Sequence, residues 1–373
     1  MPEIVLKHIT KRFGKVYAVK DFDLVVEDRD FVTLLGPSGC GKTTTLRMIS
    51  GLETPTDGEI EIDGKVVFSS EKQINLSPDK RDVGLLFQNY ALWPHMTVYQ
   101  NIAFGLENLK WKKPDIKKRV YEMAELVKIT DLLERYPAEL SGGQQQRVAI
   151  ARTLAPNPRV LLMDEPLSNL DAKLRMEMRS ELKRLHKEIE ATFVYVTHDQ
   201  YEAMTLATKI CLMKEGVLQQ YAPPLEIYDN PKNIFVGDFI GNPSMNFIES
   251  RVVDVNGKGY VLKGENLEFN FTPKNNLDNL SIGQEVIVGI RPEDIKISAD
   301  SANRCVVYST LPSGMETIIK ANLKGIPLTI VTFGRVDFEI DEEIGVDFDS
   351  YNYNVFSKSS GEKLAIGGLN LLG

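Results

Sequence analysis

Short apolar runs alternate with segments of helical periodicity up to about Tyr228. Three of these runs, at residues 31–35, 160–163 and 193–196, are apolar at nearly every position, which is typical of strands buried on both faces. Each run ends immediately before Gly-rich or polar residues, and open parallel sheets place their ligands beyond the carboxyl ends of the strands. The pattern therefore predicts an α/β fold with a largely parallel sheet and a site at one edge of it.

Two stripes of apolar residues at helical spacing predict amphipathic helices. They consist of Ile116, Val120, Met123 and Val127, and of Leu174, Met178, Leu182, Leu185 and Ile189. We interpret both stripes as faces that pack on the core rather than as binding faces. The segment from about residue 90 to 158 is expected to form an inserted, mostly helical subdomain.

The pattern changes after Pro231 to short segments in which apolar and polar residues alternate. Such segments, at residues 267–271 and 336–340, are typical of strands with one buried face, and Asn256-Gly257 is a dipeptide favoured in tight hairpins. We therefore expect an α/β domain over residues 1–235 and a smaller all-β domain over residues 236–373, which we expect to be a small barrel.

Composition narrows the class of protein. Hydrophobic residues make up 43% of the chain, which is ordinary for a globular protein, and no run of about 18 apolar residues predicts a transmembrane helix. The N-terminal residues lack the pattern of a secretory signal. Three widely spaced cysteines argue against a disulfide framework or a zinc site and fit a reducing cytosol.

The net charge of −8 is carried almost entirely by the second expected domain. Residues 236–373 hold 12 Lys+Arg and 19 Asp+Glu, a net of −7, and the remainder holds 32 and 33, a net of −1. Neither part has the basic surplus expected of a nucleic-acid binder, so we expect no nucleic-acid partner. We interpret the acidic surplus as an aid to solubility.

Residues 36–43 match the phosphate-binding pattern G-x-x-x-x-G-K-[ST] between a predicted strand and a predicted helix, which is the context that the motif requires. Glycines let backbone N–H groups surround phosphate oxygens, and the helix N-terminus adds partial positive charge. Lys42 supplies a charge for the β- and γ-phosphates, and the Thr43 hydroxyl is suited to Mg²⁺. The expected nucleotide-binding residues here are Gly36, Ser38, Gly39, Cys40, Gly41, Lys42, Thr43 and Thr44.

Two further motifs follow along the chain. Asp164 and Glu165 come directly after an apolar strand, so Asp164 is expected to organise the metal and Glu165 to polarise an attacking water as a general base. An Asp-Glu pair alone is usually a solvated loop, but the strand before it and the Gly-rich loop upstream favour the functional interpretation. Residues 141–143, Ser-Gly-Gly, open a predicted helix whose free N–H groups can bind an anion.

Together with Gln88, residues 168–171 and His198, these motifs resemble those of the ATP-binding subunits of ABC transporters over roughly the first 235 residues. The resemblance implies that two ATP molecules lie between two copies of the chain in a head-to-tail dimer, and that the residues reaching the γ-phosphate of the opposite subunit are Ser141, Gly142, Gly143 and Gln144.

The same resemblance assigns roles to single residues. It implies that Gln88 senses Mg²⁺ and water in a loop that contacts the membrane partner, and that His198 contacts the γ-phosphate. The expected catalytic residues are thus Glu165, His198 and Gln88, and the expected metal ligands are Thr43, Gln88 and Asp164. The resemblance also places Asp171 among the nucleotide-binding residues.

Phe13 occupies the place where the family stacks an aromatic ring on adenine. Tyr17 is a nearby competitor, and a core aromatic is the alternative interpretation of Phe13. Cys40 lies inside the phosphate loop at a position that is often Cys in importers, with no catalytic role implied.

Within the family, the chain most resembles the ATPases of carbohydrate importers of the maltose-transporter type, whose regulatory β-domain resembles the C-terminal region. The motifs on which this resemblance rests are residues 36–42, 90–96, 167–173, 239–243 and 289–293. The resemblance implies an ATPase at the cytoplasmic face of the membrane that uses ATP and Mg²⁺. Its expected partners are a second copy of itself, two transmembrane permease subunits and, indirectly, a solute-binding protein.

The expected solute is a sugar or oligosaccharide, but importers of sulfate, polyamines and ferric iron have similar tails and stay as alternatives. A DNA-repair or chromosome ATPase needs long coiled coils, whereas about a hundred residues without a sustained heptad separate the phosphate loop from residue 141. A translation-type ABC ATPase would carry two sets of motifs, and a GTPase would carry Asn-Lys-x-Asp. A purely regulatory protein would not need the complete catalytic set.

Overall fold

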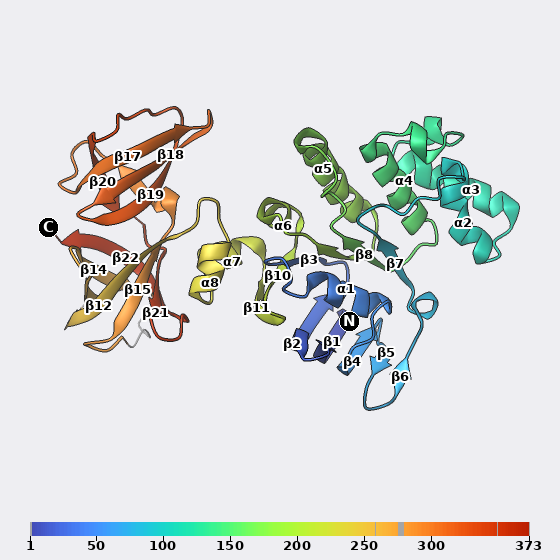
Figure 1. Cartoon of the computed structure of the whole chain (residues 1–373), viewed down its shortest axis with the longest axis horizontal. Coiled ribbons are helices and arrows are strands. Elements are labelled where there is room, and N and C mark those ends of the chain that lie inside the picture. The colour runs from blue at the N-terminus through green and yellow to red at the C-terminus, as the bar shows by residue number, and fades with distance from the viewer. Residues whose placement is uncertain (1, 258, 275–279, 349, 373) are drawn as a thin grey trace. The chain divides into compact units, whose positions relative to one another are not determined.

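The computed structural model describes residues 2–257, 259–274, 280–348 and 350–372. The chain divides into two compact units, Met1–Pro224 and Leu225–Gly373. Figure 1 shows helices and sheets in the first unit and mainly strands in the second.

The division between the units follows residue 224, whereas the boundary expected from the sequence, at residue 235, falls inside helix α8 (Ile234–Phe239). Arg291 gives the physical reason, because its buried guanidinium donates hydrogen bonds to the carbonyls of Tyr228, Gly237 and Ile240. These bonds attach α7 (Pro224–Asp229) and α8 to the second unit.

A six-stranded sheet in the order β11-β10-β3-β9-β8-β7 forms the centre of the first unit. Its strands are β3 (Phe31–Leu35), β7 (Val83–Leu86), β8 (Val160–Asp164), β9 (Thr192–Val196), β10 (Lys209–Lys214) and β11 (Val217–Ala222). All neighbours pair in parallel except β10 and β11. The three apolar runs are thus the adjacent strands β3, β9 and β8, every residue of which is buried, and the predicted parallel sheet is confirmed.

The first unit also contains an antiparallel sheet in the order β2-β1-β4-β5-β6, whose strand β2 contacts β11 of the central sheet. Its strands are β1 (Pro2–Phe13), β2 (Val16–Glu27), β4 (Asp57–Ile62), β5 (Lys65–Ser69) and β6 (Ile74–Asn75). One apolar cluster contains Ile4 and Ile60 of this sheet, Leu46 and Ile49 of helix α1 (Lys42–Ser50), and Val194 of β9. Helix α1 therefore shares its core with both sheets.

Helices fill the segment between β7 and β8. They are α2 (Val98–Asn108), α3 (Lys113–Leu126) and α4 (Gly142–Leu154), with 3₁₀ turns at Thr130–Leu132 and Pro137–Glu139. Helices α5 (Ala172–Glu188) and α6 (Gln200–Leu206) follow β8 and β9. The stripes predicted for α3 and α5 pack on one core, so their interpretation as core faces is confirmed.

The second unit contains a closed barrel in the order β12-β13-β14-β22-β21-β15 and a five-stranded sheet in the order β16-β20-β17-β18-β19. The barrel strands are β12 (Asn246–Asn256), β13 (Gly259–Lys263), β14 (Glu268–Pro273), β15 (Glu285–Ile290), β21 (Tyr353–Ser357) and β22 (Lys363–Leu372). The sheet strands are β16 (Ile295–Ile297), β17 (Arg304–Pro312), β18 (Glu316–Leu323), β19 (Ile326–Phe333) and β20 (Glu343–Phe348). The all-β prediction with a barrel is confirmed.

One predicted strand of this unit is wrong. Residues 336–340 alternate in sequence but form no strand, because side chains satisfy their backbone groups. Thr317 Oγ1 accepts from the N–H of Val336, the Phe338 carbonyl accepts from Thr310, and Glu342 accepts from the N–H of Glu339. The predicted hairpin joins β12 to β13 with Asn256 paired to Gly259; residue 258 of its turn lies outside the described residues.

Candidate functional site

The loop between β3 and α1 has the tight backbone of a glycine-rich phosphate loop. Gly39 and Gly41 have φ angles of +79° and +104°, a region that favours glycine. A Cβ atom at Gly36 would lie 2.2 Å from the Met213 carbonyl oxygen, and one at Gly41 would lie 2.4 Å from that of Ala18. No larger side chain fits at Gly36 or Gly41, so the loop requires glycine at both positions.

Lys42 lies inside this loop with only 6% of its surface exposed. Its Nζ donates to the carbonyl oxygens of Gly36 at 2.7 Å and Pro37 at 3.0 Å. No carboxylate of the described residues lies within ion-pair distance of it. A buried cation without an anionic partner is costly, so the loop fits an anion such as a nucleotide phosphate. Cys40 is also buried, and burial raises the pKa of its thiol.

Thr43 and Asp164 join the first turn of α1 to the end of β8. The Thr43 hydroxyl donates to Asp164 Oδ1 at 2.9 Å, and Asp164 Oδ2 lies 3.9 Å from the guanidinium of Arg47. Burial raises the pKa of the Asp164 carboxyl, while the Thr43 hydrogen bond lowers it. A hydroxyl and a carboxylate at hydrogen-bond distance are hard oxygen donors of the kind that Mg²⁺ prefers.

The three residues expected to be catalytic meet at one carboxylate oxygen. Glu165 Oε2 accepts from Gln88 Nε2 at 3.3 Å and lies 3.4 Å from His198 Nδ1. The residues follow the adjacent strands β7, β8 and β9, so the parallel sheet brings them together. Glu165 has a φ angle of +46°, and its N–H donates to the Val196 carbonyl at the end of β9 at 3.1 Å.

Residues 168 and 169, to which sequence reasoning gave no individual role, hold Gln88 in this arrangement. Gln88 Nε2 donates to Ser168 Oγ at 3.2 Å, and Asn169 Nδ2 donates to the Gln88 carbonyl at 3.0 Å. The Ser168 hydroxyl donates to the Glu165 carbonyl at 2.9 Å. Their position next to Asp171 in the Ser-Asn-Leu-Asp motif is the sequence signal that could have identified them.

A second anchor that the sequence did not reveal is Arg152 of α4. Its guanidinium donates to the carbonyls of Tyr90 and Ala91, both at 2.6 Å, and burial lowers its pKa to about 10. Tyr90 and Ala91 have φ angles of +61° and +47°, so the chain turns sharply directly after Gln88. Arg152 therefore fixes the segment that carries Gln88.

The Ser-Gly-Gly motif forms an exposed helix start. Ser141 caps α4 in a capping box: its hydroxyl accepts from Gln144 N at 3.4 Å, and Gln144 Oε1 accepts from Ser141 N at 2.9 Å. Ser141 and Gly142 are exposed, whereas Gly143 is buried against Leu174. Within the described part of the chain, no hydrogen bond joins Ser141 or Gln144 to the phosphate loop, so the structure does not bring these two motifs together.

Three other residues from the sequence analysis make no hydrogen bond to Glu165 within the described residues. Phe13 is 51% exposed, with Lys11 Nζ 4.7 Å from its ring centroid, so it is a surface aromatic. Tyr17 is 47% exposed and stays an alternative to Phe13 for stacking on adenine. Asp171 caps α5 by accepting from Leu174 N at 3.0 Å, a contact that explains this residue without a ligand.

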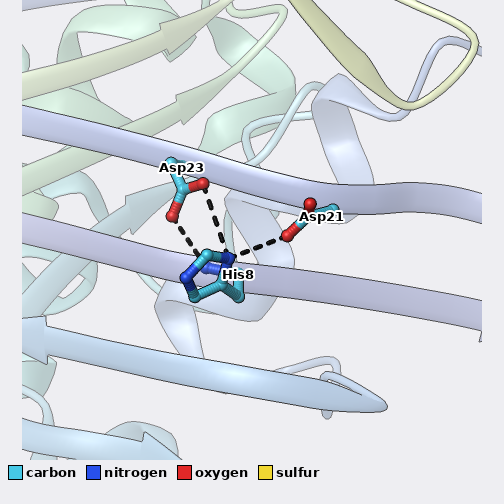
Figure 2. A group of neighbouring side chains, drawn as sticks. All are labelled: His8, Asp21 and Asp23. Atoms are coloured by element: carbon cyan, nitrogen blue, oxygen red, sulfur yellow. Dashed lines mark hydrogen bonds and ion pairs between the residues drawn. The ribbon is translucent and has the colours of Figure 1, made fainter.

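His8, Asp21 and Asp23 form a separate exposed cluster on β1 and β2 (Figure 2). His8 Nδ1 lies 2.8 Å from Asp21 Oδ1, and the backbone N–H of His8 donates to Asp23 Oδ1 at 2.8 Å. The hydrogen bond to Asp21, followed by the charges of both carboxylates, raises the pKa of His8. His8 pairs with both carboxylates, and the sequence analysis gave His8 no role.

None of the helices in the described ranges combines the length and the apolar content needed to cross a membrane.

Comparison with known proteins matches two families. Residues 19–168 match the family described as ABC transporter, and residues 241–295 match the MalK OB fold domain. The Trehalose/maltose import ATP-binding protein MalK of Thermococcus litoralis is 46% identical over 377 residues, covering 98% of this chain and 100% of its own. The Oligosaccharides import ATP-binding protein MsmX of Bacillus subtilis is 42% identical over 372 residues, covering 96% and 99%.

Solved structures resemble about three fifths of the chain. The cbiO1 protein of Clostridium perfringens, part of the ABC transporter complex cbiONQ, is 29% identical with a TM-score of 0.56, covering 61% of this chain and 90% of its own. The ATP-binding cassette MJ0796, in a dimeric post-hydrolysis state bound to ADP and Pi, is 33% identical with a TM-score of 0.51, covering 59% and 98%.

Proposed function

Because this chain belongs to the family of ATP-binding subunits of ABC transporters, we propose that it hydrolyses ATP to drive import of a sugar or oligosaccharide. Two relatives at 46% and 42% identity over almost the whole chain are named as sugar import proteins, which supports this solute class. The single observation that carries the hydrolytic role is the convergence of Gln88 and His198 on one oxygen of Glu165.

The residues of the phosphate loop fit a nucleotide. Bound ATP would supply the γ-phosphoryl group that a water molecule attacks. Residues 36–44 would hold the phosphates, and the ammonium of Lys42, which is hydrogen-bonded to backbone carbonyls, would neutralise their charge. Thr43, Gln88 and Asp164 would hold Mg²⁺. We also propose that Phe13 stacks on the adenine, since an exposed aromatic ring is free to do so.

Glu165 would act as the general base. Its Oε2 would take the proton from the attacking water, and Gln88 and His198 would orient this oxygen through their present contacts. The positive φ angle of Glu165 and the bond from its N–H to Val196 fix the backbone beneath this side chain. Holding a base at a fixed position is what general base catalysis requires.

We propose that two copies associate head to tail, so that residues 141–144 of one copy complete the site of the other. The exposed start of α4, with no hydrogen bond from Ser141 or Gln144 to the phosphate loop in the described residues, supports this. The dimeric solved relative supports it further. We further propose two permease subunits and a solute-binding protein as partners, and a location at the cytoplasmic face of the membrane.

We propose a regulatory role for the all-β region and assign ATP hydrolysis to the first unit, Met1–Pro224. The match of residues 241–295 to the MalK OB fold domain supports this assignment of functions to the two regions.

Glu165→Gln tests the hydrolytic role. The amide keeps the shape of the side chain but cannot take a proton, so turnover should fall about 100-fold or more while Mg-ATP binding stays. Steady-state hydrolysis and nucleotide titration measure the two effects. Glu177→Gln, on the exposed face of α5, is the matched control and should hydrolyse normally. Normal turnover in Glu165→Gln would remove Glu165 from the role of base.

Identifying the transported solute requires an assay with the complete transporter. The chain should be expressed with permease subunits that bind it, and ATP hydrolysis in proteoliposomes should be measured with the solute-binding protein and maltose, sulfate, spermidine or ferric iron. Stimulation by the sugar alone is expected. Stimulation by one of the other solutes instead would replace the sugar and leave the ATPase assignment intact.

A further inference from the structure

Arg175, in the first turn of α5, contacts two segments that flank Glu165. One of its guanidinium nitrogens donates to the Leu170 carbonyl at 3.1 Å, and another lies 3.7 Å from Asp199 Oδ2. Leu170 belongs to the segment 168–171 and Asp199 follows His198. One side chain thus spans from the first segment to the second.

The turn at residues 197–199 is fixed on its other sides. Asp199 Oδ1 accepts from the N–H groups of Tyr201 and Glu202 and caps α6, which leaves Oδ2 facing Arg175. The Thr197 hydroxyl donates to the buried carboxylate of Glu202 at 2.7 Å and accepts from Asp199 N at 3.0 Å. The two residues beside His198 are therefore held, and the His198 side chain is left to contact Glu165.

The segment on the other side of Arg175 holds Gln88. Ser168 and Asn169 contact the side chain and the carbonyl of Gln88, as described above. A continuous path of contacts therefore runs from Gln88 through residues 168–170 to Arg175, then through Asp199 to His198. Gln88 and His198, the two ends of this path, both contact Glu165 Oε2. Arg175 therefore connects the two segments that carry the contacts of the proposed base.

We propose that Arg175 is a positioning residue for ATP hydrolysis. It sets the spacing between residues 168–170 and the turn 197–199, and thereby places Gln88 and His198 on the same oxygen of Glu165. The inference rests on the proposed function of Glu165 as the base. Arginine suits the task because its planar guanidinium presents several donors in a fixed fork.

The alternative is that Arg175 only stabilises the fold. The side chain is 31% exposed and its ion pair with Asp199 is 3.7 Å long, and such pairs contribute little to stability. A purely structural role therefore predicts normal turnover once the variant is folded, whereas a positioning role predicts slow turnover in a well-folded protein.

The test uses Arg175→Ala, Asp199→Asn and the double variant of the full chain. The Asn side chain keeps Oδ1 as the acceptor that caps α6 and removes only the charged partner of Arg175. In Arg175→Ala we expect kcat for Mg-ATP to fall about ten-fold with KM changed less than two-fold, because small misplacements of catalytic groups slow the chemical step. The double variant should be no slower than Arg175→Ala, because both changes break the same contact.

Two controls separate positioning from folding. Arg184→Ala removes another arginine of α5, which pairs with Glu188 one turn away, and should keep normal turnover. Melting temperature and Mg-ATP binding of Arg175→Ala should stay close to those of the unaltered chain. Normal kcat in Arg175→Ala, an additive loss in the double variant, or a loss of kcat matched by a loss of folding would each overturn the proposal.

A measurement without turnover keeps this inference separate from the proposed function. In the nucleotide-free chain, the imidazole NMR signals of His198 should shift in Arg175→Ala but not in Arg184→Ala, and amide hydrogen exchange at residues 198–201 should be faster. Unchanged signals and exchange would refute the positioning role. Absence of hydrolysis in the unaltered chain would instead refute the proposed function.

Discussion

At the scale of single residues, Lys42 shows how the fold prepares a site for charge. Its ammonium is buried among backbone carbonyls, and no carboxylate of the described residues lies within ion-pair distance. The energetic cost of this arrangement falls when an anion enters the loop. Lys42→Ala should therefore weaken Mg-ATP binding and reduce hydrolysis by about 100-fold or more.

Isothermal titration and a steady-state ATPase assay check this prediction. Lys72→Ala is the matched control, since Lys72 is an exposed lysine that pairs with Glu59, and it should bind and hydrolyse ATP normally. Turnover near that of the unaltered chain in Lys42→Ala would contradict the assignment of the loop.

His8 leads to a prediction about pH. Because Asp21 and Asp23 raise its pKa in the folded state, protonated His8 stabilises the fold below its unfolded pKa of about 6.5. The stabilisation is lost as the pH rises through the folded pKa. His8→Gln should thus lower the melting temperature at about pH 5.5 and leave it unchanged above about pH 8. The difference should shrink at high salt, because the cluster is exposed and screened; a difference that grows with pH would contradict this.

Residues that are close in sequence were predictable, and residues joined only by the fold were not. The phosphate loop and the Asp164-Glu165 pair are continuous motifs, so a chemical role can be proposed for them from the sequence alone. Arg152 and Arg175 act on segments that the fold brings to them: Arg152 reaches Tyr90 and Ala91, and Arg175 reaches Asp199. No periodicity or spacing marks such long-range contacts.

At the scale of elements, the buried strands were easier to predict than segments that share the pattern of a strand but do not form one. Strands β3, β8 and β9 are continuous apolar runs that only a doubly covered sheet can bury. The alternating segment 336–340 has the pattern of a strand, yet Thr310, Thr317 and Glu342 satisfy its backbone. Binary pattern alone does not distinguish a ladder of backbone hydrogen bonds from bonds to side chains.

The exposed start of α4 leads to a prediction about the dimer. Ser141→Arg should leave ATP binding to a single copy intact and abolish hydrolysis, because in the proposed head-to-tail pair a large cation would replace the small cap at the site of the other copy. Mixing this variant with Lys42→Ala should restore part of the turnover, since a head-to-tail pair can assemble one site with both defects and one with neither.

Thr97→Arg is the matched control for Ser141→Arg. Thr97 also begins a helix with a capping box, so its replacement costs about 1 kcal/mol of cap stability and should not affect hydrolysis. ATPase activity of each variant and of the mixture measures the effect. Normal hydrolysis in Ser141→Arg, or a mixture with no recovery, would exclude the head-to-tail arrangement.

At the scale of the whole molecule, each unit has its own core. The two apolar clusters of the first unit, with the partly buried residues packed against them, contain residues up to Tyr221, and the cluster of the second contains only residues from Ile248 onward. The change of pattern near Pro231 therefore predicted the presence of two units. It did not locate the division, because Arg291 binds α7 and α8 from a distant part of the chain.

A chain that ends at Pro224 should consequently fold and bind Mg-ATP on its own. All residues proposed to bind phosphate or to act in catalysis precede this point, and neither core of the first unit loses a residue. Saturating Mg-ATP at about 100 times its dissociation constant should stabilise the truncated chain by about 2.7 kcal/mol, visible as a higher melting temperature. The truncated Lys42→Ala variant should show a much smaller shift. An insoluble product, or one whose melting temperature does not rise with Mg-ATP, would show that the β-rich unit is needed for the first unit to fold.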